Sequence, residues 1–113
     1  DFIDEDADIS PVGSTNTFQN YGPPDRPAPC FVPEKARAKA LGFTKTPGIN
    51  TIVSSTFKPC LLKFTYIWMN NNLQFWSKPV TMDWNSIGCW IFDGVNWDYN
   101  YITLKDIECF ICY

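Results

Sequence analysis

The residues with the most distinctive chemistry in this sequence are five cysteines: Cys30, Cys60, Cys89, Cys109 and Cys112. Because their number is odd, at least one thiol in an oxidising compartment stays free or bonds to another chain. Cys109-x-x-Cys112 lacks the second pair that a zinc site of this type needs, and a redox motif would belong to a βαβ unit. Residues three apart on a strand point to opposite faces, so we expect these two thiols to have different partners. We interpret all five cysteines as candidates for disulfides or crosslinks, with the pairing left open and inert buried thiols as the alternative.

The carboxylates are the next group to consider, because the sequence contains no histidine. Without histidine, the commonest general base and the commonest metal ligand are missing, and nucleophile–histidine triads are excluded in their usual form. The acidic residues that could form the carboxylate pair of a glycoside hydrolase are Asp83, Asp93, Asp98 and Asp106. Asp83 and Asp93, however, stand where turns are expected, and Asp is a favoured turn residue. Since no glycine-rich phosphate loop is present either, we predict that the protein is not an enzyme and uses no cofactor or metal.

The five tryptophans offer a different chemistry, the stacking of aromatic rings on the faces of sugars. Small β domains with exposed tryptophans commonly bind carbohydrate, but aromatic residues are also strand formers that supply large buried areas. Trp84 lies in the polar sequence Asp83-Trp84-Asn85. It is therefore the best candidate for an exposed, ligand-stacking ring. The remaining tryptophans, expected mainly in the core, are Trp68, Trp76, Trp90 and Trp97.

From residue 50 onward, the sequence has the pattern of a β domain that would position these residues. Runs rich in aromatic and β-branched residues recur at spacings of about ten residues and are separated by short turn sequences. The expected strands are residues 50–57, 61–69, 73–82, 86–92, 95–102 and 103–113, with Pro79 marking an edge or a bulge. This pattern predicts a mainly β fold, a small antiparallel sandwich or barrel of the meander or jelly-roll kind.

One short surface helix is predicted ahead of the β domain, over residues 33–41. Pro33 and Glu34 favour a helix start, and Gly42 favours its end. Residues 34–41 between them consist of strong helix formers. The apolar side of this helix holds only alanines and Leu41, so we expect it to lie on the surface.

Residues 1–29 have the composition of an extended arm. They contain five prolines and six acidic residues against Arg26 alone, a net charge of −5, and they show no helical or strand periodicity. Fixing such a segment costs about 1–2 kcal/mol of backbone entropy per residue, so an ordered arm needs a packing surface on its own domain or on a neighbouring subunit. The sequence thus divides into an acidic, Pro-rich arm (1–29), a helix and connector (30–49) and an aromatic-rich β domain (50–113).

Length, charge and hydropathy limit the class of protein. With 113 residues and a net charge of −3, the chain has room for one domain. A core of about sixty residues would fold with little margin unless disulfides or a partner help. The short basic run over residues 35–45 is too small for a nucleic-acid footprint, and no apolar run reaches the roughly eighteen residues needed to span a bilayer. The chain begins at Asp1 without Met, which is compatible with removal of an upstream signal segment.

A pattern of aromatic residues and turns runs through residues 60–112. It consists of residues 60–68 (CLLKFTYIW), three asparagines, Phe75-Trp76, Ser86-Ile87-Gly88, Trp90, Gly94, Trp97, Tyr99, Ile102 and Leu104-x-x-Ile107. This half of the chain resembles short uncharacterised Trp- and Tyr-rich proteins of spore-forming Firmicutes, which have a Tyr-x-Trp strand, an Asn-Gly turn, a Phe-Trp strand and a closing Ile-x-Leu-x-x-Ile segment. At the first turn, Asn stands here where those proteins have Gly. The resemblance implies a bacterial, spore- or surface-associated setting and no particular activity.

We predict a structural protein that assembles with copies of itself, such as a filament, spore appendage or coat subunit. Three features lead to this prediction: an arm that needs a packing surface, an odd number of cysteines, and aromatic strands. An extended arm can add a strand to a neighbour's sheet edge and gain main-chain hydrogen bonds. We expect a homo-oligomer or polymer with an extracellular or cell- or spore-surface location. The alternatives are a secreted carbohydrate-binding module that uses Trp84 and an accessory subunit of a large complex.

Overall fold

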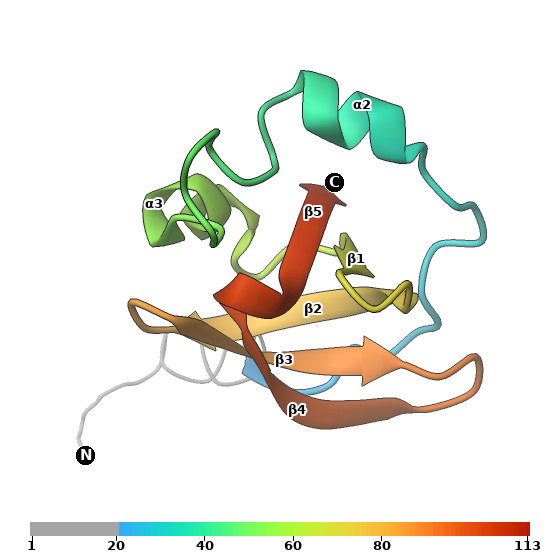
Figure 1. The fold of residues 1–113 in the computed structure, drawn as a ribbon. Coiled ribbons are helices and arrows are strands. Elements are labelled where there is room, and N and C mark those ends of the chain that lie inside the picture. The colour runs from blue at the N-terminus through green and yellow to red at the C-terminus, as the bar shows by residue number, and fades with distance from the viewer. Residues whose placement is uncertain (1–20) are drawn as a thin grey trace, which may run out of the picture.

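The computed structural model describes residues 21–113 of the chain, and its main feature is one antiparallel β-sheet (Figure 1). The five strands are β1 (Thr65–Met69), β2 (Gln74–Met82), β3 (Ser86–Phe92), β4 (Trp97–Thr103) and β5 (Ile107–Cys112). Two short α-helices, α2 (Lys35–Ala40) and α3 (Ser54–Phe57), precede the sheet in the described residues. The 3-10 turn η1 (Lys58–Cys60) follows α3, and the 3-10 turn η2 (Leu104–Asp106) lies between β4 and β5. The prediction of a mainly β fold is confirmed.

The strand order is β4-β3-β2-β1-β5, so the first four strands form a meander and β5 pairs with β1. β4 and β5 therefore lie at opposite edges of the sheet, although only the three residues of η2 connect them. A connection this short requires the sheet to curl back on itself. Figure 1 shows the result, with β1 and β5 lying across the layer of β2, β3 and β4. The curled sheet thus has an inner and an outer face.

The inner face encloses the main hydrophobic core. Its buried side chains are Ile52, Phe57, Cys60, Ile67, Ile87, Cys89, Ile102, Leu104, Ile107 and Phe110. Phe57 of α3 packs on Phe110 of β5, with ring centroids 4.5 Å apart. The core is therefore completed by residues that precede the first strand.

A second, largely aromatic cluster covers the outer face. Its buried members are Ala38, Tyr66, Trp68, Trp76, Cys109 and Ile111. Tyr66 of β1 stands opposite Trp76 of β2 and opposite Ile111 of β5, so three neighbouring strands share one apolar face. Ala28 and Ala38, from the N-terminal part of the described chain, pack against this face. The outer face is therefore partly covered by residues that the sequence assigns to the arm and the helix.

The predicted turns are present. Asn72 follows β1 with a φ of 72°, a left-handed conformation that Asn tolerates better than most residues. Gly94, with a φ of 104°, turns the chain from β3 to β4. The β2–β3 register shifts between Pro79 and Thr81, which confirms the predicted irregularity at Pro79.

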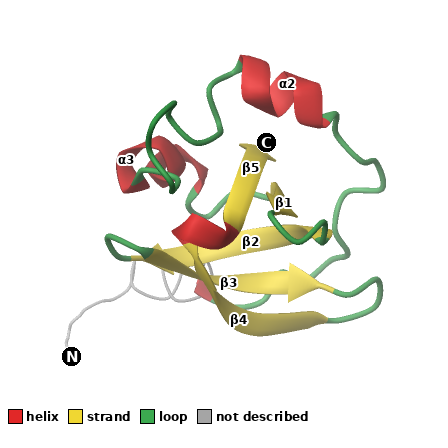
Figure 2. Ribbon diagram, viewed as in Figure 1, coloured by secondary structure: helices red, strands yellow, loops and turns green. Residues whose placement is uncertain are grey.

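One strand prediction was wrong, and another was wrong in part. The strand expected over residues 50–57 is not formed, and residues 54–57 make the one-turn helix α3 instead (Figure 2). The helical turn buries Phe57 completely, and Pro59 continues the compact bend into η1. The strand expected from residue 61 begins only at Thr65, because Leu62 has a φ of 68° and interrupts the extended chain.

Helix α2 lies inside the predicted range of residues 33–41 and is followed by Gly42 with a φ of 84°. Its one buried residue, Ala38, joins the outer cluster. Lys35 and Lys39 form salt bridges with the two carboxylate oxygens of Glu108 on β5, at 3.0 and 2.9 Å. The helix is therefore held against β5 by one small apolar contact and a pair of ionic contacts.

Candidate self-association site

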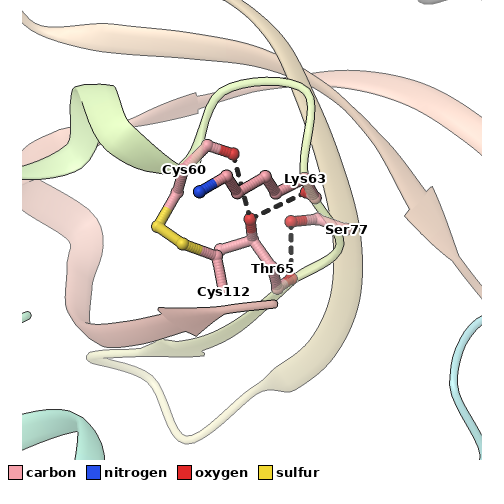
Figure 3. The surroundings of a disulfide bond; sticks show 5 residues. All are labelled: Cys60, Lys63, Thr65, Ser77 and Cys112. Carbon is pink, nitrogen blue, oxygen red and sulfur yellow. Dashed lines mark hydrogen bonds between the residues drawn. A yellow bond between two sulfur atoms is a disulfide. The ribbon is translucent and has the colours of Figure 1, made fainter.

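One disulfide bond joins Cys60 to Cys112, with Cα atoms 5.5 Å apart and a sequence separation of 52 residues. Cys60 ends η1 and Cys112 ends β5, so the bond ties the last strand to the segment that leads into β1 (Figure 3). The buried hydroxyl of Thr65, opposite Cys112 in the ladder, lies 3.3 Å from the Cys60 carbonyl oxygen. Ser77 donates its hydroxyl to the Thr65 carbonyl at 2.8 Å. The polar groups around the disulfide are thus satisfied by protein partners.

The remaining three cysteines carry free thiols in different surroundings. Burial raises the pKa of Cys89 to about 12, and burial together with the nearby charge of Glu108 raises that of Cys109 to about 11. A thiol that stays protonated is a poor nucleophile, so both cysteines are unreactive. Cys30 is exposed. Because Cys112 is bonded inside its own chain, Cys30 is the one exposed thiol.

The predicted division of the Cys-x-x-Cys pair is confirmed. Cys109 packs in the outer aromatic cluster, whereas Cys112 packs against the inner core and bonds to Cys60. Cys60 lies in η1, between the strands expected over residues 50–57 and 61–69. A 3-10 turn brings its sulfur into the core at the end of β5.

Asp83 and Asp93 are turn residues, as predicted. The Asp83 carboxylate accepts hydrogen bonds from the backbone N–H groups of Asn85 and Ser86 at 3.0 and 2.9 Å, and Asp93 accepts from the residues at the same offsets. These backbone donors lower the pKa of both carboxyl groups. Both carboxyl groups therefore stay ionised and are unsuited to donate a proton. No cluster of three or more His, Cys, Asp or Glu side chains among residues 21–113 could hold a metal ion.

Trp84 differs from the other tryptophans in its exposure. Its side chain is 81% exposed in the turn between β2 and β3, whereas Trp68 and Trp76 are buried and Trp90 and Trp97 are half-buried. The prediction that Trp84 is exposed is confirmed. A sugar platform would have to be built around this one ring.

Three other tryptophans bind the main chain of the N-terminal segment. The indole N–H groups of Trp90, Trp97 and Trp76 donate to the carbonyl oxygens of Tyr21, Arg26 and Phe31, respectively, at 3.0, 2.9 and 3.0 Å. The three tryptophans come from β3, β4 and β2, so the segment is attached at points spread across the outer face. Part of the predicted arm, residues 21–29, thus lies on its own sheet, while residues 1–20 lie outside the described residues.

The outer edge of β4 is the most open part of the sheet backbone. Hydrogen bonds from Leu104 N to Asn85 O and from Asp93 N to Asn96 O mark the two ends of the β3–β4 ladder. Because hydrogen-bonded and non-hydrogen-bonded pairs alternate in an antiparallel ladder, the unbroken register between them directs the N–H and C=O groups of every second residue outward. These residues are Trp97, Tyr99, Tyr101 and Thr103.

This edge lacks the features with which sheets usually discourage strand addition. β4 has the sequence WDYNYIT, with no lysine, no proline and no bulge over its seven residues. Within residues 21–113, no other strand pairs with its outer side. The opposite edge is different, because Phe110 of β5 donates its N–H to Phe43 O and Cys109 forms a bridge with Thr44.

The side chains next to the open edge are aromatic and exposed. Tyr99 packs edge-on against Trp90 and Tyr101, with ring centroids 5.0 and 5.4 Å apart. Its hydroxyl is 3.4 Å from that of Thr81, and these two hydroxyl oxygens occupy the space over Gly88 where a Cβ atom would stand. Tyr101 is 75% exposed. A strand added at this edge would find both unpaired main-chain groups and apolar rings.

Comparison of the chain with protein-family models, with curated proteins and with solved structures gave no match. None of the helices described over residues 21–113 is long and apolar enough to cross a bilayer. The function is therefore argued from the geometry of the chain alone.

Sequence reasoning missed the two features that distinguish this surface. The edge position of β4 follows from the pairing of β5 with β1, which joins segments about forty residues apart. The indole hydrogen bonds connect residues 45 to 71 positions apart and need the curled sheet to exist. A usable signal for the edge was the complete absence of lysine and proline from residues 97–103.

Proposed function

We propose that this chain is a structural subunit that assembles with copies of itself by strand pairing at the β4 edge. The observation that carries the proposal is the regular seven-residue edge, with four outward-facing main-chain positions and exposed tyrosines beside it. Such an edge is a template for another strand.

The mode of pairing decides the shape of the assembly. If β4 pairs with β4 of a second copy, the contact is two-fold symmetric and closes as a dimer; if a different segment of the neighbour is added, the contact is head-to-tail and can propagate into a filament. A filament, spore appendage or coat built in this way requires the second mode. The intrachain disulfide supports an oxidising, extracellular or surface setting.

Substitution of Tyr101 by proline tests the pairing directly. Tyr101→Pro removes an outward N–H without removing a β3–β4 hydrogen bond, so the subunit should fold and the edge should be blocked. Tyr101→Ser is the matched control, because it removes the ring and keeps the N–H. Light scattering and negative-stain microscopy should show assemblies for the wild type and the serine variant and a folded monomer for the proline variant.

Two results would refute the proposal. One is a wild-type protein that stays monomeric even in concentrated solution. The other is a proline variant that assembles like the wild type. Loss of assembly in both variants would assign the contact to the ring rather than to the backbone.

Carbohydrate binding remains the second candidate function because Trp84 is so exposed. If a glycan array or a polysaccharide pull-down finds a ligand, Trp84→Ala should abolish binding while Trp84→Phe retains part of it through stacking. If the protein is monomeric and binds such a ligand, the proposal of a self-assembling subunit is wrong and the protein is a carbohydrate-binding module.

A further inference from the structure

The outer face of the sheet holds an extended, proline-rich segment in a manner that resembles the binding of a ligand. Residues 22–34 (GPPDRPAPCFVPE) contain five prolines and form neither helix nor strand. They nevertheless lie on the aromatic face, attached by the indole hydrogen bonds of Trp76 and Trp97, and the Trp90 indole holds the preceding Tyr21. Proline-rich chains are typically recognised in aromatic-lined grooves, because their extended form costs little entropy to fix.

Side-chain contacts give this attachment its register. The Arg26 guanidinium lies over the Phe64 ring, 5.3 Å from its centroid. The Phe31 ring meets Trp76 and Tyr113 edge-on, with centroids 5.4 and 5.2 Å apart. The two anchors are five residues apart, and each lies next to an indole–carbonyl bond. An extended segment placed here is thus fixed at two side chains and along its backbone.

Hollows on both sides of residues 23–27 show that the segment lies on the face and is not embedded in it. One, of about 290 Å³, is lined by Pro24, Arg26, Lys63, Phe64 and Lys78, among others. The other, of about 400 Å³, lies between Pro23, Pro27, Phe92 and Trp97. A segment with open space along both sides can leave the face without disturbing the inner core.

We propose that the outer aromatic face is a receptor for an extended, proline-rich segment, and that within an assembly it takes residues 21–33 of a neighbouring copy in place of its own. This inference deepens the proposed function and rests on it for the identity of the partner. The second copy is the occupant that fits, because the contacts made within one chain can be made identically between two chains, as in domain swapping.

In an isolated subunit, the chain's own segment blocks the receptor. A tethered ligand has a high effective concentration, so an outside segment binds only in the fraction of molecules whose own segment has left. The exchanged residues end directly before α2, which Lys35 and Lys39 hold on β5 through Glu108. The exchange would therefore turn at residues 33–34, which form neither helix nor strand, and α2 would stay in place.

The test uses the full-length protein and a fluorescent peptide of residues 21–33 with serine in place of Cys30. Phe31→Ala weakens the resident segment and leaves the receptor intact, so it should bind the peptide about tenfold more tightly than the wild type, in proportion to the larger open fraction. Introduced into Phe31→Ala, whose resident segment is already weakened, Trp76→Phe lacks the N–H that holds the carbonyl of residue 31 of the bound peptide and should lose most binding. Trp97→Phe serves the same purpose at a half-buried position, should Trp76→Phe fail to fold. A scrambled peptide of equal composition is the control.

Binding of the native peptide to Phe31→Ala, but not of the scrambled one, would support the receptor. Failure of Phe31→Ala to bind, or equal binding of the scrambled peptide, would overturn it. Tyr101→Pro separates this inference from the proposed function: introduced together with Phe31→Ala, it should leave peptide binding unchanged while it blocks the β4 edge. In the wild type and in Phe31→Ala, whose β4 edge is intact, peptide binding without assembly refutes edge pairing, and assembly without peptide binding refutes the receptor.

Discussion

Cys30, Cys89 and Cys109 carry the free thiols of the chain, and their reactivity should follow their burial. The thiolate is the reactive form, and the raised pKa values of Cys89 and Cys109 keep both protonated at neutral and mildly alkaline pH. Cys30 lies in an exposed segment next to Phe31. A crosslink between subunits would therefore form at the segment that we propose to exchange.

Alkylation of the native protein at pH 8 should modify one thiol per chain, Cys30. Cys89 and Cys109 should react only after unfolding, and Cys60 and Cys112 only after unfolding and reduction. Peptide mass spectrometry with two differently massed alkylating agents, one added before and one after denaturation, assigns each site. Rapid native labelling of Cys89 would show that the inner core opens more readily than its packing indicates.

Removal of the disulfide should lower the free energy of unfolding substantially. A loop of 52 residues corresponds to about 4 kcal/mol in the chain-entropy treatment, and measured losses for small domains run from about 2 to 5 kcal/mol. The double variant Cys60→Ala/Cys112→Ala should show this loss in urea titration. Cys30→Ser is the control and should match the wild type. A loss below about 1 kcal/mol would mean that the strands hold the ends of the loop without the covalent bond.

At the scale of secondary-structure elements, α2 is the least firmly attached. It is six residues long, buries only Ala38 and is held to β5 by Lys35 and Lys39 on Glu108. Hydrogen bonds from Lys39 and then Lys35 lower the pKa of Glu108. A carboxyl group with a lowered folded-state pKa contributes stability above its unfolded pKa and loses that contribution as the pH falls through the folded value.

Glu108→Gln should therefore be slightly less stable than the wild type at pH 7 and equal to it at acid pH, where Glu108 is protonated in both folded and unfolded chains. The effect should be small because the pair is exposed to solvent. Thermal unfolding of both proteins from pH 7 down to pH 2.5 measures the difference. Glu34→Gln is a suitable control, since Glu34 precedes α2 without capping it through its side chain. A difference that persists at low pH would point to packing rather than charge.

The elements also show what the sequence could and could not predict. Strands β2 and β3, the turns at Asp83 and Asp93 and helix α2 follow from local patterns, because turn residues and helix formers act within a few positions. The one-turn helix α3 was missed because burial of Phe57 against Phe110 outweighs the strand pattern of residues 50–57. Trp84 could be placed on the surface from its polar neighbours. The β4 edge and the indole contacts depend on long-range pairing, which no local pattern encodes.

At the scale of the whole molecule, residues 21–33 connect the chain's N-terminal part to the domain. A truncation that begins at residue 34 should be less stable than one that begins at residue 21, since it loses three indole–carbonyl hydrogen bonds and the Phe31 and Arg26 contacts. At about 1 kcal/mol per hydrogen bond, we expect a difference of about 2–4 kcal/mol. Urea titration measures it, and binding of a hydrophobic dye should increase as the aromatic face is exposed.

Equal stability of the two truncations would show that the segment adds nothing to the fold. The receptor would then have no measurable affinity for its own ligand.

The disulfide also has a mechanical consequence. Because it joins residues 60 and 112, a pulling force applied between the N-terminal segment and Tyr113 passes through the sulfur–sulfur bond and bypasses all five strands. Of the residues that the structure describes, only 21–59 can then be drawn out, and the 52-residue closed loop retains roughly 180 Å of contour length at about 3.5 Å per residue. Under such a load the segment of residues 21–33 on the outer face would be released first, and the strands inside the disulfide-closed loop would not be drawn out.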